Sequence, residues 1–367
     1  MDNSRRPPYS RKKGKQGLTM ADQTVYSTAP SAATERLVHM ARLLLKQWDV
    51  EAKAIDVVQS GQMALVWKVH TDGGPKCLKR IHRPEKKALF SIYAQDALAK
   101  KGLYVPRIIE TRDHRLFKRY GPFLFVLYDW IEGTPFDLAI RDDLTAMIGA
   151  LAHFHARSAG YEPPPGVPVF SKLGKWPKHY MKRCRQLEAW KQLAELDRDD
   201  PFSRLYLAEI DRFIEKGEEV LQQLLDSHYE AWVEQLKKRP SLCHQDYGTG
   251  NSLRGEDGNV WIIDLDTAAF DLPIRDVRKM MAPFLFDADQ QGKTRADIVL
   301  EAYEEVRPLT KKEKEVLLID LLFPYDLHEL AVEKYIRNVP LAEAELAEAM
   351  AYEQAKWETI ERRLASL

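Results

Sequence analysis

Short apolar stretches alternate with polar turns between residues 50 and 130, a pattern typical of β-strands. Before these stretches, apolar residues recur with helical spacing at 33–48, which predicts a helix. A second helix is predicted at 84–101, where Pro84 suits the first helical turn. The predicted strands lie at 55–58, 64–69, 76–81, 105–109, 116–119 and 123–127. We therefore expect a β-rich N-terminal lobe at residues 31–130.

After residue 130 apolar positions recur every three to four residues, which is typical of helices. Helices are predicted at 144–158, 176–196, 201–225 and 229–236, strands at 252–253 and 260–265, and mostly helix from there to residue 367. A mainly helical C-terminal lobe is therefore expected at 131–367. Residues 1–30 are basic and poor in aliphatic side chains, which predicts a disordered tail and leaves Met1 or Met20 as the start.

Composition and charge narrow the class of protein. The chain has 367 residues, with 55 Lys and Arg balanced by 55 Asp and Glu, so bulk charge does not favour nucleic acid or anionic membranes as partners. The 3 cysteines lie far apart without metal-ligand spacing, which favours a reducing compartment. We find no bilayer-length apolar run and no apolar core of a signal peptide, so synthesis in the cytoplasm without a signal peptide is expected.

One stretch has the residue types and spacing of phosphoryl-transfer chemistry. His244, Asp246 and Asn251 form an H-x-D-x4-N pattern, and an apolar strand that follows it ends at Asp264. A loop carboxylate at Asp246 can accept the proton of an acceptor hydroxyl, while the oxygens of Asn251 and Asp264 are ligands that suit Mg²⁺. The pattern predicts a locally acidic, metal-dependent centre.

A cation for the nucleotide phosphates is predicted on the third strand. Strand alternation places Cys77 and Lys79 on one face and Leu78 on the other. The turn at Ser60 and Gly61, between the first two strands, lies where a loop over the phosphates belongs, although one glycine is a weak signal.

These motifs resemble the aminoglycoside phosphotransferase and choline kinase branch of the protein kinase-like fold over roughly residues 50–340. Within that branch, the blocks at 78–86, 88–92, 244–251 and 271–276 are similar to the CotS family of bacterial spore coat proteins. The resemblance implies an α+β, two-lobed protein kinase-like fold of the aminoglycoside phosphotransferase type. Its N-lobe would be a small antiparallel β-sheet, and its large, mainly helical C-lobe would hold the catalytic loop and the acceptor site.

The resemblance also implies ATP and Mg²⁺ as cofactors and a role for each site residue. Asp246 would be the catalytic base, and Asn251 and Asp264 would bind Mg²⁺. The remaining roles are nucleotide contacts through Ser60, Gly61, Lys79 and the backbone of Asp129 and Ile131, and support of the catalytic loop by His244 and Asp276.

Two functions remain open at this stage. The first is a spore coat-associated phosphotransferase that acts on a hydroxyl of a small molecule or sugar, with other spore coat proteins as possible partners. The second is a weak or inactive pseudokinase that serves as a structural coat component, because the helix after Lys79 has no glutamate where kinases pair one with this lysine. Glu85 lies too early and Asp96 is a short substitute.

The basic run at 172–185 is a further candidate, since it could hold an anionic acceptor, although such a run is more often a solvated helix face. Trp176 and Tyr180 within it could stack on a sugar ring or belong to the core.

Overall fold

The computed structural model describes residues 32–60, 65–288 and 292–367. The predicted basic tail, Met20 and Gly61 of the predicted phosphate loop lie outside these residues. The described chain forms two compact units, a β-rich unit of residues 32–171 and 239–271 and a helical unit of residues 172–238 and 272–367. The candidate catalytic loop therefore belongs to the same compact unit as the sheet, whereas the predicted boundary between two lobes near residue 130 stays a prediction.

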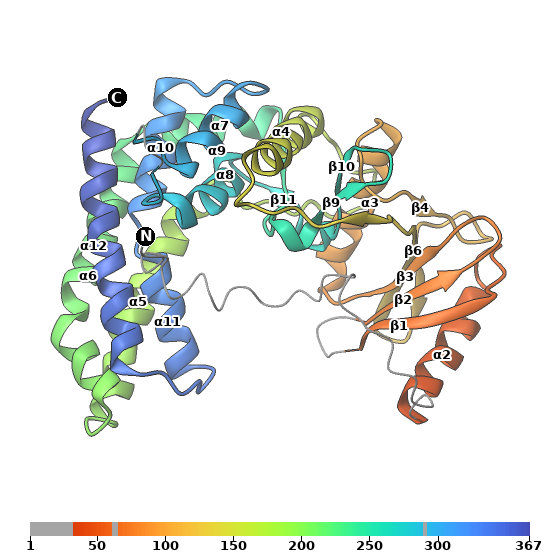
Figure 1. Cartoon of the computed structure of the whole chain (residues 1–367), viewed down its shortest axis with the longest axis horizontal. Helices are drawn as coiled ribbons and strands as arrows, with labels where there is room; N and C mark the ends of the chain where they lie inside the picture. Colours follow the sequence, from red (N-terminus) through yellow and green to blue (C-terminus); the bar gives the residue numbers. More distant parts are fainter. Residues whose placement is uncertain (1–31, 61–64, 289–291) are drawn as a thin grey trace. The chain divides into compact units, whose positions relative to one another are not determined.

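An antiparallel sheet forms the N-terminal part of the β-rich unit (Figure 1). Its strands are β1 (Ala54–Ser60), β2 (Leu65–His70), β3 (Lys76–Ile81), β4 (Ile108–Ile109), β5 (Lys118–Tyr120) and β6 (Phe123–Asp129). They follow the order β1-β2-β3-β6-β4, and β5 also pairs with β6. The strand predicted at 105–109 shrinks to two residues, because Pro106 has no N–H to donate to a ladder.

Each face of this sheet is covered by a different helix. Helix α2 (Ala32–Leu45) joins Trp67, Leu78 and Leu127 in one apolar cluster. On the other face, α3 (Glu85–Lys100) packs Ala88 and Ile92 against a second cluster, to which Cys77 also packs. The predicted alternation along β3 is therefore confirmed, since Leu78 and Cys77 lie on opposite faces.

The rest of the β-rich unit carries the candidate catalytic loop. It contains β7 (Gly133–Thr134), α4 (Arg141–Ser158), β8 (Leu242–Cys243), η1 (Thr249–Asn251), β9 (Ser252–Gly255), β10 (Val260–Ile262), η2 (Leu265–Thr267) and β11 (Ala269–Phe270). β10, β9 and β7 form one small sheet, and β11 pairs with β8. The strand predicted at 260–265 ends at Ile262, because Asp264 has a left-handed backbone with φ of 58°.

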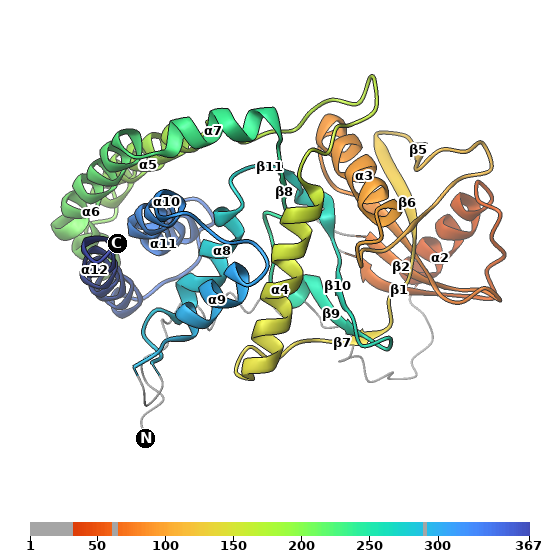
Figure 2. The same cartoon turned by 90° about the horizontal axis from the view of Figure 1, so that it is seen from above.

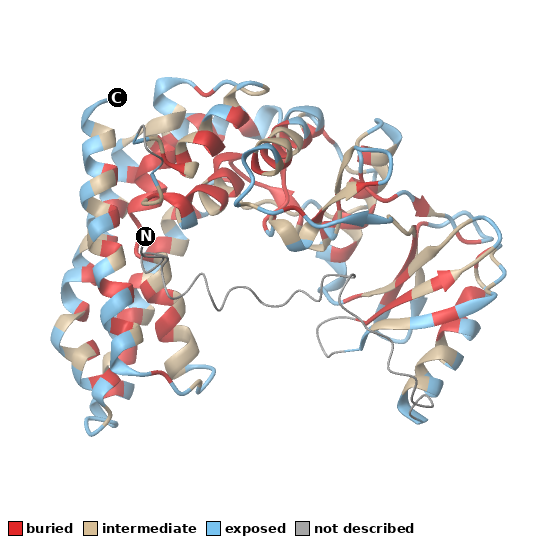
Figure 3. Cartoon of the chain, viewed as in Figure 1, coloured by how far each residue is buried: buried red, intermediate tan, exposed pale blue. Residues whose placement is uncertain are grey.

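The helical unit consists of α5 to α12 (Figure 2). These helices are α5 (Trp176–Glu195), α6 (Pro201–Asp226), α7 (Tyr229–Lys238), α8 (Ile274–Met281), α9 (Arg295–Glu304), α10 (Lys311–Leu322), α11 (Tyr325–Tyr335) and α12 (Glu343–Ala365), with a short η3 (Ala282–Phe284) after α8. Seven consecutive buried residues, Val316–Leu322, make α10 the centre of the unit, and Figure 3 shows buried residues on its neighbours too. None of the described helices is long and apolar enough to span a bilayer.

Local sequence signals explain where several of these helices begin and how closely they pack. Asp200 caps α6 by accepting a hydrogen bond from Ser203 N at 2.9 Å. Thr294 and Thr310 form capping boxes at the starts of α9 and α10. Gly217 lets α6 approach α5, because a Cβ there would lie 2.7 Å from the sulfur of Cys184.

His328 makes the stability of the helical unit depend on pH. Its ring is 8% exposed, with Nε2 3.2 Å from Gln186 Oε1, and burial together with Arg183 and Lys182 lowers its pKa from 6.5 to about 3. The unfolded chain therefore binds a proton at His328 more readily than the folded chain does. The stability that the neutral ring contributes is present above pH 6.5 and is lost as the pH falls toward 3. We expect the free energy of unfolding to fall by about 2 kcal/mol between pH 6.5 and 5 through this group.

Urea unfolding at both pH values measures this effect. His328→Gln should remove that part of the pH dependence, whereas the exposed control His39→Gln should keep it. An unchanged pH dependence in His328→Gln would show that the buried ring does not control acid stability.

Candidate active site

Lys79 lies at the centre of the sheet and is held by two carboxylates. On β3 it pairs in register with Val66 of β2 and Val126 of β6. Its Nζ lies 2.9 Å from Asp264 Oδ1 and 2.9 Å from Asp266 Oδ2. The structure therefore brings together two residues that the sequence predicted for one site although they are 185 positions apart.

Burial and charge act against each other in this cluster. Burial by itself would lower the pKa of Lys79, but Asp266 and Asp264 raise it well above its ordinary value. Burial likewise opposes ionisation of Asp264, yet Lys79 overcomes it and lowers the pKa of that carboxyl. For Asp266, burial and the neighbouring Asp264 raise the pKa although Lys79 opposes them. Lys79 is thus a firmly protonated cation between two acids of different exposure.

The chain turns sharply where the acids are placed. Asp264 adopts φ of 58°, a left-handed conformation that Asp tolerates better than branched residues do. This residue separates β10 from η2, and Asp266 lies within η2. The turn therefore lets two acids that are only two positions apart reach the same ammonium group.

His244 anchors the candidate catalytic loop through both nitrogens of its ring. Its Nδ1 accepts a hydrogen bond from the Asp246 N–H at 3.3 Å, which requires the ring proton on Nε2, and Nε2 lies 2.9 Å from Ile263 O. Gln245 has φ of 72° and donates from Nε2 to Asp271 Oδ2 at 2.9 Å. The chain reverses between a buried His244 and an exposed Asp246, whose Oδ2 lies 3.4 Å from Asn251 Nδ2.

Hydrogen bonds tie the loop to the segment that carries the two acids. Asn251 Nδ2 donates to Asp246 O at 2.7 Å, and Ile263 N donates to Asn251 O at 3.0 Å. Thr267 Oγ1 donates to His244 O at 2.7 Å. Asp246, Asn251 and the 263–267 segment are therefore fixed relative to one another within the β-rich unit.

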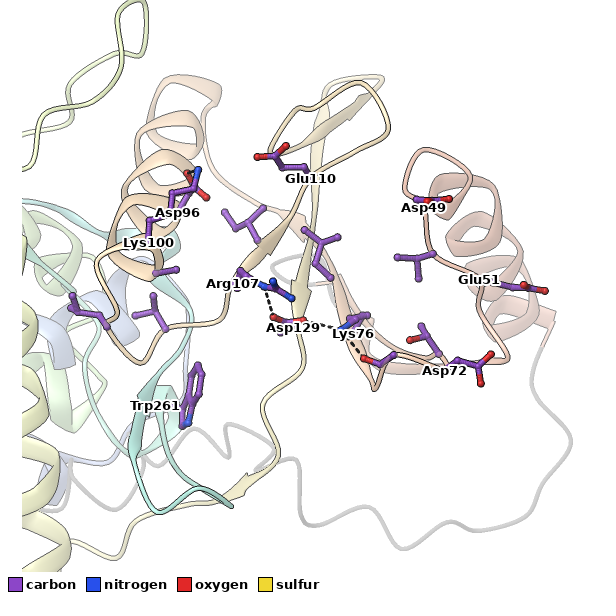
Figure 4. Close-up of a pocket in the computed structure, with 18 residues that line it drawn as sticks. Asp49, Glu51, Asp72, Lys76, Asp96, Lys100, Arg107, Glu110, Asp129 and Trp261 are labelled. Atoms are coloured by element: carbon purple, nitrogen blue, oxygen red, sulfur yellow. Dashed lines mark hydrogen bonds and ion pairs between the residues drawn. The ribbon is translucent and has the colours of Figure 1, made fainter.

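Asp129 and Ile131, predicted for the adenine contact, lie at and just after the end of β6. The N–H of Asp129 donates to Arg107 O at 2.9 Å, and its carboxylate pairs with Lys76 at 2.8 Å and Arg107 at 3.0 Å. That carboxylate faces a hollow of about 860 Å³, shown in Figure 4, which extends to α3 and Trp261. Lys79, Asp246 and Asp264 do not line this hollow, so it is separate from the candidate centre.

The remaining predicted residues, Ser60 and Asp276, lie on other elements, at the end of β1 and in α8. Ser60 is exposed at the last position of β1, and its neighbour Gly61 is outside the described residues. Asp276 is buried in the first turn of α8 in the helical unit, where Arg275 Nη1 lies 3.1 Å from its carboxylate. Its predicted support of the catalytic loop stays a prediction.

Two aromatic residues of the basic run belong to the core. Trp176 is 5% exposed and Tyr180 is 1% exposed. The hydroxyl of Tyr180 donates to Asp320 at 2.5 Å, and its ring stacks on Phe323. Both side chains are therefore used inside the helical unit and are not exposed platforms for a sugar.

The sequence did not identify the second partner of Lys79. Glu85, at the start of α3, pairs with Arg119, and Asp96 further along the helix pairs with Lys100 at 2.7 Å. Asp266 fills the role of partner instead. Its only signal in the sequence was its position two residues after a candidate metal ligand.

Comparisons with known proteins bear on the family and the fold of this chain. The model of the phosphotransferase enzyme family matches residues 54–310. Spore coat protein S of Bacillus subtilis is 31% identical over 273 residues, which cover 74% of this chain and 78% of that protein. This match agrees with the resemblance of the sequence to the spore coat CotS family.

Solved structures share the fold at low sequence identity. An aminoglycoside phosphotransferase from Alicyclobacillus acidocaldarius superposes with a TM-score of 0.67 at 17% identity, covering 95% of this chain and 100% of the other. A spectinomycin phosphotransferase solved with ADP and spectinomycin has a TM-score of 0.54 at 16% identity, covering 87% and 98%. These similarities confirm the predicted α+β kinase-like fold. The chain belongs to the phosphotransferase enzyme family and, within it, to the spore coat CotS group of kinase-like proteins.

Proposed function

We propose that this protein transfers the γ-phosphoryl group of ATP to a hydroxyl of a small molecule or sugar. The observation that carries the proposal is the position of Lys79 Nζ, 2.9 Å from Asp264 and from Asp266, in the same unit as the loop that presents Asp246. A cation for the phosphates, oxygen ligands for a metal and an exposed carboxylate for the acceptor are what this reaction requires.

Asp246 is the proposed base. Its carboxylate is exposed, so an acceptor hydroxyl can reach it, and its backbone is held at both N–H and C=O. The base accepts the hydroxyl proton as the acceptor oxygen attacks the γ-phosphorus, and ADP leaves with the electron pair of the broken bond. Because its loop is fixed, Asp246 need not reorganise during the reaction.

Asn251 and Asp264 are suited to hold Mg²⁺. Asn251 uses Nδ2 to donate to Asp246 O, its Oδ1 accepts no hydrogen bond from the described residues, and Asp264 offers a half-exposed carboxylate. Both supply hard oxygen donors, which Mg²⁺ prefers. A bound Mg²⁺ supplies charge neutralisation for the phosphates, and Lys79 adds a fixed positive charge beside them.

The end of β6 is the proposed adenine contact. Within the described chain, the N–H of Ile131 has no hydrogen-bond acceptor, so it can donate to a ring nitrogen of adenine. Ser60 and Gly61 keep their proposed place beside the phosphates.

The spore coat is the proposed location, because a spore coat protein is 31% identical to this chain. A small hydroxylated acceptor is supported by the neighbour solved with spectinomycin. Coat proteins are proposed as partners on the same ground as the location.

A thermal shift with ATP and Mg²⁺ tests nucleotide binding. Ligand that binds only the folded state stabilises it, by about 2.7 kcal/mol when its concentration is 100 times Kd. We expect wild type to show a higher Tm with both ligands, and Lys79→Ala to lose most of the shift. Lys53→Ala is the control, because Lys53 pairs with Asp72 before β1 and its side chain is 61% exposed.

A structural coat component without activity is the second candidate, and one observation favours it. Neither acid of α3 reaches Lys79, because Glu85 and Asp96 are engaged by Arg119 and Lys100. The absence of any Tm shift at millimolar ATP with Mg²⁺ would favour this scaffold. A shift without turnover on sugars and amino alcohols would indicate a nucleotide-binding pseudokinase.

A further inference from the structure

Lys79, the proposed phosphate ligand, is held by acids at and within η2 and by none on α3. Of its two carboxylate partners, Asp264 has a side chain that is 47% exposed, whereas that of Asp266 is 14% exposed and that of Lys79 is 13% exposed. The buried contact of Lys79 is therefore the one with Asp266. A buried cation needs such a partner, since an unpaired charge there would be costly.

Helix α3 cannot supply this partner. Its acids Glu85 and Asp96 face basic residues elsewhere. Its buried polar side chains are also satisfied elsewhere, because Ser91 Oγ donates to Ala88 O at 3.1 Å and Gln95 Nε2 donates to Pro106 O at 2.8 Å. The helix packs instead against η2, the short helix that contains Asp266.

The two acids are also placed for different tasks. Asp264 is the more exposed, and once it binds a metal its negative charge is shared between that metal and Lys79. Asp266 keeps a carboxylate beside Lys79 whatever Asp264 binds. A single acid would leave Lys79 and Mg²⁺ in competition for the same oxygens.

We propose that Asp266 is the positioning residue for Lys79, so that η2 performs the task that an acid on α3 would otherwise perform. This inference rests on the proposed phosphotransfer. It means that the lack of a glutamate on α3 does not by itself make the protein inactive.

A double-mutant cycle tests the inference, with MgATP turnover measured on the sugar or amino alcohol that wild type phosphorylates fastest. Asp266→Asn should lower kcat about a hundredfold, the order expected when a reacting group is displaced by about 1 Å. Asp266→Glu should recover part of this loss. The control is Asp96→Asn, which breaks the ion pair between Asp96 and Lys100 on α3. Its kcat should stay within about twofold of wild type.

The cycle is completed with Lys79→Met. If Asp266 acts through Lys79, adding Asp266→Asn to Lys79→Met should cause no further loss. Adenosine, which lacks phosphates, should bind Asp266→Asn as it binds wild type, and this shows that the site remains folded.

Three results would overturn the inference. They are a kcat of Asp266→Asn close to wild type, full additivity with Lys79→Met, or a loss of adenosine binding equal to the loss of turnover. Wild type that neither binds nor turns over ATP would instead reject the proposed function, and this positioning role with it.

Discussion

Replacing Asp246 with Asn should lower phosphotransfer by about a hundredfold to ten-thousandfold, the range for loss of a general base. Asparagine matches the shape of the side chain but cannot accept the hydroxyl proton. The loop should survive, because His244 Nδ1 and Asn251 Nδ2 bond the backbone N–H and C=O of residue 246. The Tm shift with ATP and Mg²⁺ should therefore remain, which separates chemistry from binding.

Turnover of MgATP with and without acceptor measures this loss. Asp72→Asn is the matched control, since Asp72 is an exposed acid of the turn between β2 and β3 and its side chain is 84% exposed. Turnover by Asp246→Asn within threefold of wild type would remove Asp246 from the mechanism. A simultaneous loss of the Tm shift would mean that residue 246 acts in binding or folding.

Replacing Lys356 with Met should lower the free energy of unfolding by about 3–5 kcal/mol, the cost of breaking a buried ion pair from one side. Lys356 and Glu353 lie one turn apart on α12, with Nζ and Oε2 2.5 Å apart and side chains 3% and 0% exposed. Glu353 also accepts a hydrogen bond from Asp326 N at 2.9 Å, and Lys356 donates to Phe323 O at 3.1 Å. Removing the cation leaves a buried carboxylate without its partner.

The pH dependence of this loss has a definite sign. Burial raises the pKa of Glu353 from 4.5 to about 7 although Lys356 opposes it. An acid whose pKa is raised on folding contributes stability below its unfolded pKa and loses it as the pH rises through the folded value. The loss in Lys356→Met should therefore be larger at pH 8 than at pH 5, where Glu353 takes up a proton.

Guanidinium unfolding monitored by circular dichroism measures both effects. Lys237→Met is the matched control, because Lys237 and Glu234 have the same i, i+3 spacing at 2.6 Å but side chains that are 52% and 60% exposed. Its loss should stay within about 1 kcal/mol. A Lys356→Met variant no less stable than Lys237→Met would show that the buried pair contributes nothing.

Much of the fold follows from short-range rules, and the predictions made from them were largely confirmed. The predicted strand at 76–81 coincides with β3, and the helix predicted at 201–225 with α6, to within one residue. Alternation placed Lys79 on the face opposite Leu78, because successive side chains of a strand point to opposite sides. Errors arose where single residues override a pattern, as at Pro106 and at the left-handed Asp264.

The sequence by itself determined the β-rich and helical stretches, the family and the candidate residues, because periodicity and motif spacing are properties of neighbouring positions. Only the tertiary structure decided which acid holds Lys79. Its partners lie 185 and more positions away and reach it through a turn at Asp264 that no spacing rule predicts. The acids that the sequence offered, Glu85 and Asp96, are near in the chain but paired elsewhere. The partner of a buried charge is whichever opposite charge the packing of the fold buries beside it.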